Sequence, residues 1–218
     1  TRISGDMLES ALAAGILAVG GNVIKAGVIP TPAVAYLAKY YEADAGIVIS
    51  ASHNTFEYNG IKFFNGEGYK LDDDIEEEIE DIIISSRDVN SHITGALIGR
   101  CLEASEDAAR LYADHLLSTA DFRLDGMKIA LDCANGASYS IAPKVYEALG
   151  AEVIVMGNEP NGVNINEGCG STHPEKLAEL VRKTGAHVGL AFVGDADRLI
   201  VVDEKGNVID GDRVIAIC

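Results

Sequence analysis

The chain has 218 residues and a formal net charge of −17, with 34 acidic residues against 17 basic ones. This acidic balance argues against a general nucleic-acid surface and against a surface for anionic membranes. Hydrophobic residues make up 48% of the chain, which allows a sizeable core and argues against disorder. The length suits one large domain or two ordinary ones.

The cysteines form no C-x-x-C pair and show no zinc-binding spacing. We interpret them as reduced and mostly structural, which fits a cytoplasmic protein. We expect neither a signal peptide nor a membrane-spanning run. The chain begins at Thr1 without a methionine and stops inside an apolar run, so we expect both ends to be cut from a longer protein. The cysteines are Cys101, Cys133, Cys169 and Cys218.

Helices and strands are expected to alternate in the first part of the chain. Apolar residues at helical spacing predict a helix that ends near Val19, and residues 22–26 are predicted to form a strand. Thr31 suits a helix N-cap, so a second helix is expected to run to about residue 41. The apolar run 45–49 then predicts a buried strand. This alternation favours an α/β sheet.

A polar segment follows directly after that buried strand. Ser52 is predicted to lie at the carboxyl end of the strand, where open α/β sheets bind their ligands. A serine hydroxyl is a weak nucleophile until another group eases its deprotonation. His53, Lys62 and carboxylates that hold a metal are the candidates for that role. The alternative is a polar turn in which Ser and Asn serve turn chemistry alone.

The middle of the chain, from the turn at residue 65 to about residue 117, is predicted from local signals. Asn65-Gly66 predicts a hairpin turn, and isoleucines at helical spacing predict an amphipathic helix over 72–84. Residues 85–102 are expected to be irregular, and a helix is expected over 104–117. We place a domain boundary within this last helix, so that residues 1–108 and 109–218 form two domains.

A second α/β series is expected after about residue 128. The Asn- and Gly-rich segment 157–170 is a long predicted loop, for which we expect a functional use. Thr172 and Glu175 have the spacing of a capping box and predict the start of a helix. The predicted strands are 128–133, 152–156, 187–193, 199–203 and 207–209, and the predicted helices are about 137–149 and 172–184.

A second polar loop, Gly194 to Arg198, follows a buried strand in the same way as the first. The alternate carboxylates of Asp195 and Asp197 can point the same way and share one hard cation such as Mg²⁺. Arg198 suits a phosphate. In isolation, a solvated turn is the alternative. Together, the two loops favour phosphoryl transfer through positioning and electrostatic stabilisation.

Four segments, in matching order and separation, resemble the α-D-phosphohexomutase family over nearly the whole chain. Two further segments, 60–64 and 168–175, resemble the subgroup that acts on glucosamine phosphates. The four family segments are Arg2–Gly5 (R-x-S-G), Gly27–Pro32 (G-x-x-P-T-P), Ser50–Asn54 with Asn59–Lys62 (the phosphoserine loop), and Gly194–Arg198 (the metal loop, D-G-D-x-D-R).

The resemblance implies two consecutive α/β domains with mixed, mostly parallel sheets flanked by helices. It implies that Ser52 is the phosphoserine and that His53 and Lys62 lie beside the transferring group, with Lys62 as a candidate general acid or base. The implied Mg²⁺ ligands are Asp195, Asp197 and the phosphate on Ser52. The residues implied to bind substrate or phosphate are Arg2, Asn54 and Arg198.

The implied reaction interconverts glucosamine 6-phosphate and glucosamine 1-phosphate through glucosamine 1,6-bisphosphate, on the route to cell-wall amino sugars. The implied partner is a small hexosamine phosphate. Neither a nucleic acid nor a membrane is an implied partner, and whether the protein forms a homodimer is left open. Two alternatives also stay open. One is a mutase for mannose or glucose phosphates, and the other is an inactive paralogue that only binds sugar phosphates.

Two positions depart from the family pattern. Thr55 replaces a proline, and Val193 replaces the first aspartate of the metal loop. An isopropyl group cannot replace an oxygen ligand, so we expect weakened metal binding and slow transfer. The family has four domains, and this chain resembles the later part of the first and most of the second. We therefore expect the chain alone to be inactive and its first domain to have an exposed sheet edge.

Overall fold

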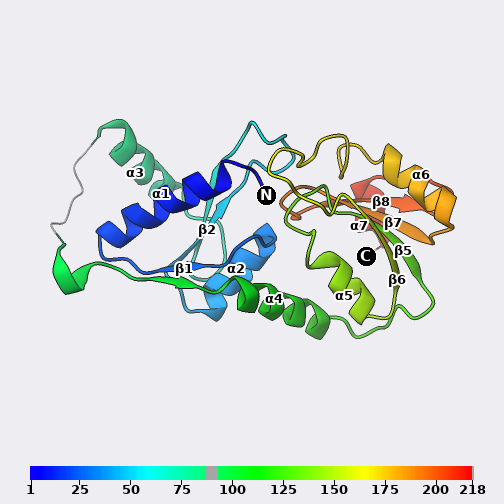
Figure 1. The fold of residues 1–218 in the computed structure, drawn as a ribbon, viewed down its shortest axis with the longest axis horizontal. Coiled ribbons are helices and arrows are strands. Elements are labelled where there is room, and N and C mark those ends of the chain that lie inside the picture. The colour runs from blue at the N-terminus through cyan, green and yellow to red at the C-terminus, as the bar shows by residue number, and fades with distance from the viewer. Residues whose placement is uncertain (87–92, 218) are drawn as a thin grey trace.

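The computed structural model describes residues 1–86 and 93–217. Its elements fall into two halves, with the N-terminus between them and helix α4 (Ser105–Thr119) running along one side (Figure 1). The predicted irregular stretch 85–102 lies partly outside the described residues. Within the described part, no helix is long and apolar enough to cross a membrane.

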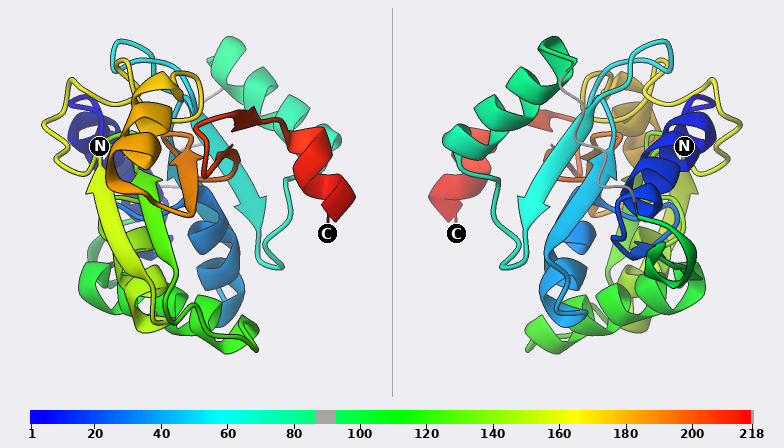
Figure 2. Two further views of the ribbon diagram at one scale, coloured as in Figure 1. Left: turned by 90° about the vertical axis from the view of Figure 1, so that its right-hand side faces the viewer. Right: turned by 90° about the vertical axis from the view of Figure 1, so that its left-hand side faces the viewer.

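The first half contains two small sheets, and one of them brings Lys62 toward the candidate serine. Strands β2 and β3 pair antiparallel, with Val48 opposite Lys62, and are drawn as adjacent opposed arrows in Figure 2. The other sheet pairs β1 with β4 in parallel. The elements are α1 (Gly5–Ala18), β1 (Val23–Lys25), α2 (Thr31–Tyr40), β2 (Ala45–Ile49), β3 (Ile61–Asn65), α3 (Asp73–Ile84), the 3₁₀ turn η1 (Gly95–Leu97) and β4 (Cys101–Glu103).

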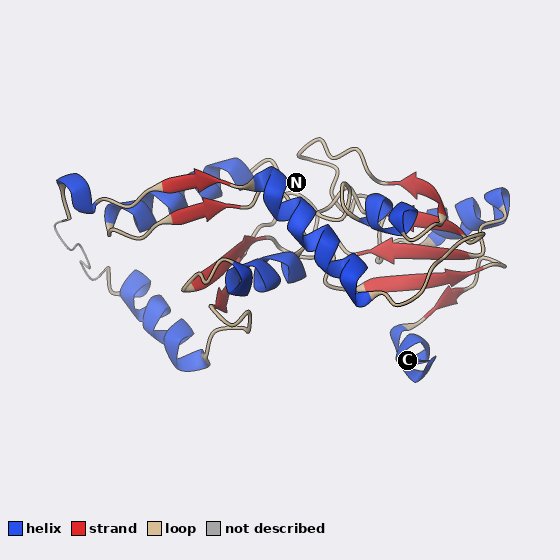
Figure 3. Cartoon of the chain, turned by 90° about the horizontal axis from the view of Figure 1, so that it is seen from below, coloured by secondary structure: helices blue, strands red, loops and turns tan. Residues whose placement is uncertain are grey.

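The second half is built on one five-stranded sheet in the order β6-β5-β7-β8-β9, which Figure 3 separates from the small sheets of the first half. Strands β6, β5 and β7 are parallel, and β8 and β9 continue the sheet antiparallel. The elements after α4 are β5 (Lys128–Asp132), α5 (Ala142–Ala148), β6 (Glu152–Met156), α6 (Glu175–Thr184), β7 (Val188–Phe192), β8 (Leu199–Asp203), β9 (Val208–Ile209) and α7 (Gly211–Ile217).

Helices cover both faces of this sheet, because alternate residues of a strand point to opposite faces. On β5, Ile129 and Leu131 join a cluster with Ala142 of α5. Ala130, between them, joins a separate cluster with Leu177 of α6. The α/β class with mixed sheets is therefore confirmed. Among the described strand pairs, three are parallel and three are antiparallel.

A third hydrophobic cluster joins the two halves. Leu37 of α2 packs in one cluster with Tyr112 of α4 and Val145 of α5. Helix α4 thus lies between the halves and contacts both. Because the two halves share this core, the polar loops after β2 and β7 keep fixed positions relative to each other.

Three local predictions were wrong. Thr31 does not cap α2, because Pro30 is the N-cap and the Thr31 hydroxyl bonds to Asp195 instead. The capping box at Thr172 does not form either. Helix α6 begins only at Glu175, because the preceding turn is hydrogen-bonded elsewhere, with the Ser171 N–H donating to the carbonyl of Phe192 at 3.0 Å.

Helix α5 begins at Ala142, later than the expected start near residue 137. The Ala137 N–H donates to the carbonyl of Gly194 at 2.7 Å, which commits this stretch to the loop after β7. The Asn65-Gly66 turn reverses the chain as expected, since the N–H of Asn65 donates to the carbonyl of Tyr69 at 2.8 Å.

Candidate active site

Ser52 lies in the loop after β2 in a left-handed backbone conformation, with φ of 52°. Such a conformation is costly for a residue with a side chain and persists only where surrounding contacts maintain it. The hydroxyl of Ser50 accepts the Ser52 N–H at 3.1 Å. Ser50 in turn donates its N–H to the carbonyl of Gly60 at 2.9 Å, next to the start of β3. The end of the β2–β3 ladder therefore shapes the serine loop.

The Ser52 hydroxyl contacts two charged groups of the loop after β7. It donates a hydrogen bond to Oδ1 of Asp195 at 3.0 Å, and it accepts one from Nη2 of Arg198 at 3.0 Å. A serine oxygen between a carboxylate and a guanidinium has both a proton acceptor and a cation in direct contact. The two polar loops that the sequence singled out thus meet at one atom.

The Asp195 carboxylate is the centre of the site, and its side chain is only 2% exposed. Its second oxygen, Oδ2, accepts from Nζ of Lys62 at 2.6 Å and from the hydroxyl of Thr31 at 3.1 Å. The carbonyl of Asp195 also accepts the Thr31 N–H at 2.9 Å. Three segments, the loop after β2, strand β3 and helix α2, therefore converge on one carboxylate.

The environment of Asp195 favours its charged form. Burial acts to raise the pKa of this carboxyl, but the hydrogen bond and the charge of Lys62 act in the opposite direction. The hydroxyls of Ser52 and Thr31 add to the lowering. The pKa of Asp195 is lowered overall, because hydrogen bonds and an opposite charge both stabilise a carboxylate.

Asp197 and Arg198 lie on the outer side of the site. The Asp197 carboxylate is 3.7 Å from Nζ of Lys62 and 3.3 Å from Nε of Arg198. The Arg198 side chain is 65% exposed. Lys62 therefore contacts both aspartates of the loop. Arg198 contacts the Ser52 hydroxyl and is itself largely exposed to solvent.

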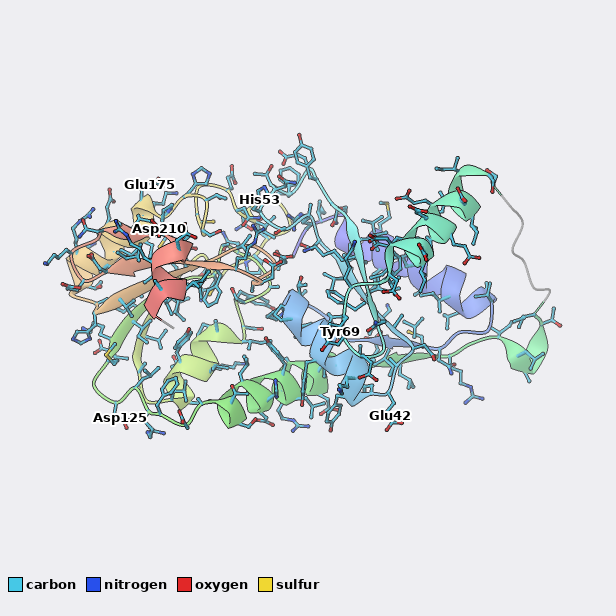
Figure 4. The ribbon with its side chains drawn as sticks, turned by 180° about the vertical axis from the view of Figure 1, so that it is seen from behind. Glu42, His53, Tyr69, Asp125, Glu175 and Asp210 are labelled. Atoms are coloured by element: carbon cyan, nitrogen blue, oxygen red, sulfur yellow. The ribbon has the colours of Figure 1, made fainter. Side chains whose placement is uncertain are left out.

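The other predicted site residues lie around the serine loop rather than on its hydroxyl. His53 is exposed and lies at the boundary between the halves (Figure 4). Asn54 is also exposed, and it contributes its backbone carbonyl to the contacts described here. Arg2 is 6% exposed, and its guanidinium donates to the carbonyls of Tyr58, Asn54 and Ser52 at 2.8, 2.7 and 3.2 Å. Burial lowers the pKa of Arg2, and the charge of Asp195 partly opposes that effect.

Two residues at the site were missed from the sequence as site residues. Thr31 was assigned to helix capping, although it lies in the family-like segment Gly27–Pro32. Asn166 lies in the loop 157–170, for which a functional use was expected without a particular residue. Its side chain reaches the serine loop, with Nδ2 2.9 Å from the carbonyls of Ser52 and Asn54. The loop's length was the only signal for it.

The donor set for a divalent cation is incomplete. Val193 occupies the first position of the metal loop, is 1% exposed and has no oxygen in its side chain. Among the described residues, no group of three His, Cys, Asp or Glu side chains is arranged to hold a metal ion. The remaining carboxylates, Asp195 and Asp197, would need a phosphate on Ser52 as a third ligand. These residues therefore do not fit the three-aspartate site that the family pattern implies.

Family models match most of the chain. The phosphoglucomutase/phosphomannomutase model for α/β/α domain I matches residues 1–89, and the model for α/β/α domain II matches residues 110–206. The chain belongs to this family. The resemblance inferred from the four loops is therefore confirmed at the family level.

Relatives within the family include phosphoglucosamine mutases. That of Alkaliphilus metalliredigens is 56% identical and that of Clostridium novyi is 58% identical, each over 218 residues. These alignments cover 100% of this chain and 48% of each relative, so the chain spans about half the length of the curated relatives it matches.

Solved structures of family members share the fold. A phosphoglucomutase/phosphomannomutase family protein from Burkholderia thailandensis is 30% identical with a TM-score of 0.83, over 99% of this chain and 47% of that one. A variant of the Aspergillus fumigatus N-acetylphosphoglucosamine mutase, described in complex with glucose 1,6-bisphosphate, is 15% identical with a TM-score of 0.54. That match covers 94% of this chain and 56% of the other, and it shows likeness of fold alone.

Proposed function

We propose that this chain is part of a phosphoglucosamine mutase, which interconverts glucosamine 6-phosphate and glucosamine 1-phosphate through a phosphoserine at Ser52. The contacts of the Ser52 oxygen, 3.0 Å from both Asp195 and Arg198, are the observation that supports this most directly. The names of relatives at 56–58% identity support the amino sugar as substrate. We also propose a domain boundary at residues 108/109, which lies within α4 and between the two family-model matches.

In this proposal the phosphoryl group moves between Ser52 and a sugar hydroxyl. The bond from phosphorus to the Ser52 oxygen breaks as the bond to the sugar oxygen forms, and the sugar hydroxyl gives up its proton. Lys62 is the proposed proton-transfer group, because its ammonium and the Ser52 hydroxyl share the Asp195 carboxylate. The ammonium would protonate the Ser52 oxygen as it leaves, and the resulting amine would take the proton of the sugar hydroxyl. Return of the group from the 1,6-bisphosphate restores the phosphoserine.

The charged residues lower the barrier by stabilising negative charge on the transferring group. Arg198 donates to the Ser52 oxygen and would donate to its phosphate. Arg2 and Asn54 are proposed to support substrate and phosphate binding through the serine loop that they stabilise. His53 is exposed beside that loop, where it would contact the sugar phosphate.

Mg²⁺ is kept as a proposed cofactor, although the donor set lacks one family carboxylate. Asp195, Asp197 and a phosphate on Ser52 would hold the ion, and when bound it would neutralise phosphate charge. Glucosamine 1,6-bisphosphate is the proposed activating intermediate.

The test is phosphoryl uptake from glucosamine 1,6-bisphosphate by the full-length protein that contains this chain, measured as the intact mass of that protein. The expected result is one added phosphoryl group, which Ser52→Ala abolishes. Ser118→Ala, an exposed serine of α4, is the matched control and should leave uptake unchanged. Binding of the bisphosphate without transfer would favour the inactive, sugar-phosphate-binding paralogue, and uptake that survives Ser52→Ala would exclude Ser52 as the acceptor.

A further inference from the structure

Asn166 reaches the serine loop from the opposite half of the molecule. It lies between β6 and α6, is 3% exposed and has a left-handed backbone with φ of 57°. Its N–H donates to the carbonyl of Ala134 at 2.9 Å, which anchors its backbone. Its side-chain amide nitrogen donates to the carbonyls of Ser52 and Asn54, both at 2.9 Å.

Arg2 donates to the same two carbonyls. Its Nη2 lies 3.2 Å from the carbonyl oxygen of Ser52 and 2.7 Å from that of Asn54. A carbonyl oxygen has two lone pairs, so each of these oxygens has a donor for both. The Ser52–His53 and Asn54–Thr55 peptide planes are thereby fixed by an amide and a guanidinium.

The approach of Asn166 depends on a glycine in the loop after β7. A Cβ on Gly194 would lie 2.7 Å from Nδ2 of Asn166 and 2.8 Å from the carbonyl oxygen of Ser52. Contacts that short force something to move. The loop that supplies Asp195 and Arg198 therefore packs directly against the amide that contacts Ser52.

We infer that Asn166 is a positioning residue for Ser52, and this rests on the proposed function of Ser52. With Arg2, it holds the Ser52 carbonyl so that the left-handed backbone directs the hydroxyl to Asp195 and Arg198. Without the amide donor, one lone pair of each carbonyl loses its partner, and the loop is free to relax toward a more favourable φ. The hydroxyl would then leave its two charged neighbours.

Two substitutions at position 166 distinguish the effect of losing the amide donor from the effect of changing the backbone conformation. Asn166→Asp keeps the size and the tolerance for positive φ but replaces the donor with an oxygen that repels both carbonyls. Asn166→Gly accepts the same φ with no side chain. Asn164→Asp is the matched control, because it makes the same change in the same loop, where its Nδ2 donates to the carbonyl of Glu159 at 3.0 Å.

Two readouts are measured, the first on each variant of the chain and the second on the full-length protein with the same substitution. The backbone ¹³C and amide chemical shifts of Ser52 report its left-handed conformation without any reaction. The rate of phosphoryl uptake from glucosamine 1,6-bisphosphate reports the consequence for transfer. We expect Asn166→Asp to shift the Ser52 signals and slow uptake at least tenfold, Asn166→Gly to do so less strongly, and Asn164→Asp to match the parent chain.

Unchanged Ser52 signals in a folded Asn166→Asp variant would overturn the inference, as would shifted signals with an unchanged uptake rate. If Asn166→Asp does not fold, the same criteria apply to Asn166→Gly. If the full-length parent protein takes up no phosphoryl group, the proposed function fails, and the Ser52 signals alone decide whether Asn166 positions the serine.

Discussion

The Nζ atom of Lys62 lies 2.6 Å from Oδ2 of Asp195. Lys62 belongs to β3 of the first half and Asp195 to the loop after β7 of the second, so this ion pair joins two sheets. The carboxylate is 2% exposed and the lysine side chain 35%. A partly buried pair of this kind affects stability mainly through what its loss leaves behind.

Lys62→Met should destabilise the chain, because it leaves the buried Asp195 carboxylate without its cation. We expect the free energy of unfolding to fall by about 1–3 kcal/mol, the range for a buried polar group that loses its partner. Urea unfolding monitored by circular dichroism measures this change. The proposed phosphate-binding site should lose its shape at the same time.

A surface pair provides the control for this prediction. Lys39 and Glu67 lie 3.2 Å apart with side chains 69% and 70% exposed, so Lys39→Met should leave the unfolding free energy close to that of the parent chain. The double variant Lys62→Met/Asp195→Asn should recover part of the loss, because the uncompensated charge is gone. Equal effects of the two lysine substitutions would contradict the argument.

Thr31→Val should weaken the same site by a different route. The Thr31 hydroxyl donates to the buried Asp195 carboxylate at 3.1 Å, and valine keeps the shape but removes the donor. Hydrogen bonds to charged groups contribute about 1.5–3 kcal/mol, so a loss of that order is expected in denaturant unfolding. Thr31→Ser keeps the hydroxyl and should lose clearly less. A serine variant as unstable as the valine variant would show that packing of the methyl group dominates.

Ala196→Gly should stabilise the chain. Ala196 has φ of 57°, and a left-handed conformation costs a residue with a Cβ roughly 1–2 kcal/mol. Glycine removes that cost, although it adds freedom to the unfolded chain, so we expect a net gain of up to about 1 kcal/mol in thermal unfolding. Ala14→Gly, at an exposed position in α1, is the control and should destabilise by about 0.5–1 kcal/mol. A loss at both positions would contradict the strain argument.

The sequence predicted the order of elements well, because strong local signals mark them. The apolar run 45–49 and the isoleucines of 72–84 gave β2 and α3 nearly to the residue. Helix starts were predicted less well. Thr31 and Thr172 have the residue type of a cap, but tertiary contacts with the loop after β7 and with β7 itself take precedence there.

The residues of the candidate site were also predicted only in part. Ser52, Asp195 and Arg198 follow strand ends, so their convergence could be expected from the rule that ligands bind there. Lys62 lies near the start of β3 and is brought to them by the pairing of β3 with β2. Asn166 could not be identified, because nothing in its local sequence shows that its amide crosses to the other half. Arg2 was assigned to phosphate binding, and in the structure its guanidinium donates to loop carbonyls. Only the tertiary fold determines such long-range polar contacts.

Val193→Asp should raise the affinity for Mg²⁺. It would supply a third carboxylate beside Asp195 and Asp197, and hard divalent cations bind more tightly as oxygen ligands and charge are added. We expect the dissociation constant measured by isothermal titration calorimetry to fall at least tenfold, which is about 1.4 kcal/mol of binding free energy.

The same substitution should make stability depend on the metal. Position 193 is 1% exposed, so an unpaired carboxylate there should destabilise the metal-free chain, and Mg²⁺ should restore the unfolding temperature by binding the folded state. Val163→Asp, at a 39% exposed position, is the control and should show no added response to Mg²⁺. If Val193→Asp binds Mg²⁺ no better than the parent chain, Val193 is not the reason for a weak metal site. The two aspartates and a phosphate on Ser52 would then be enough to bind the ion.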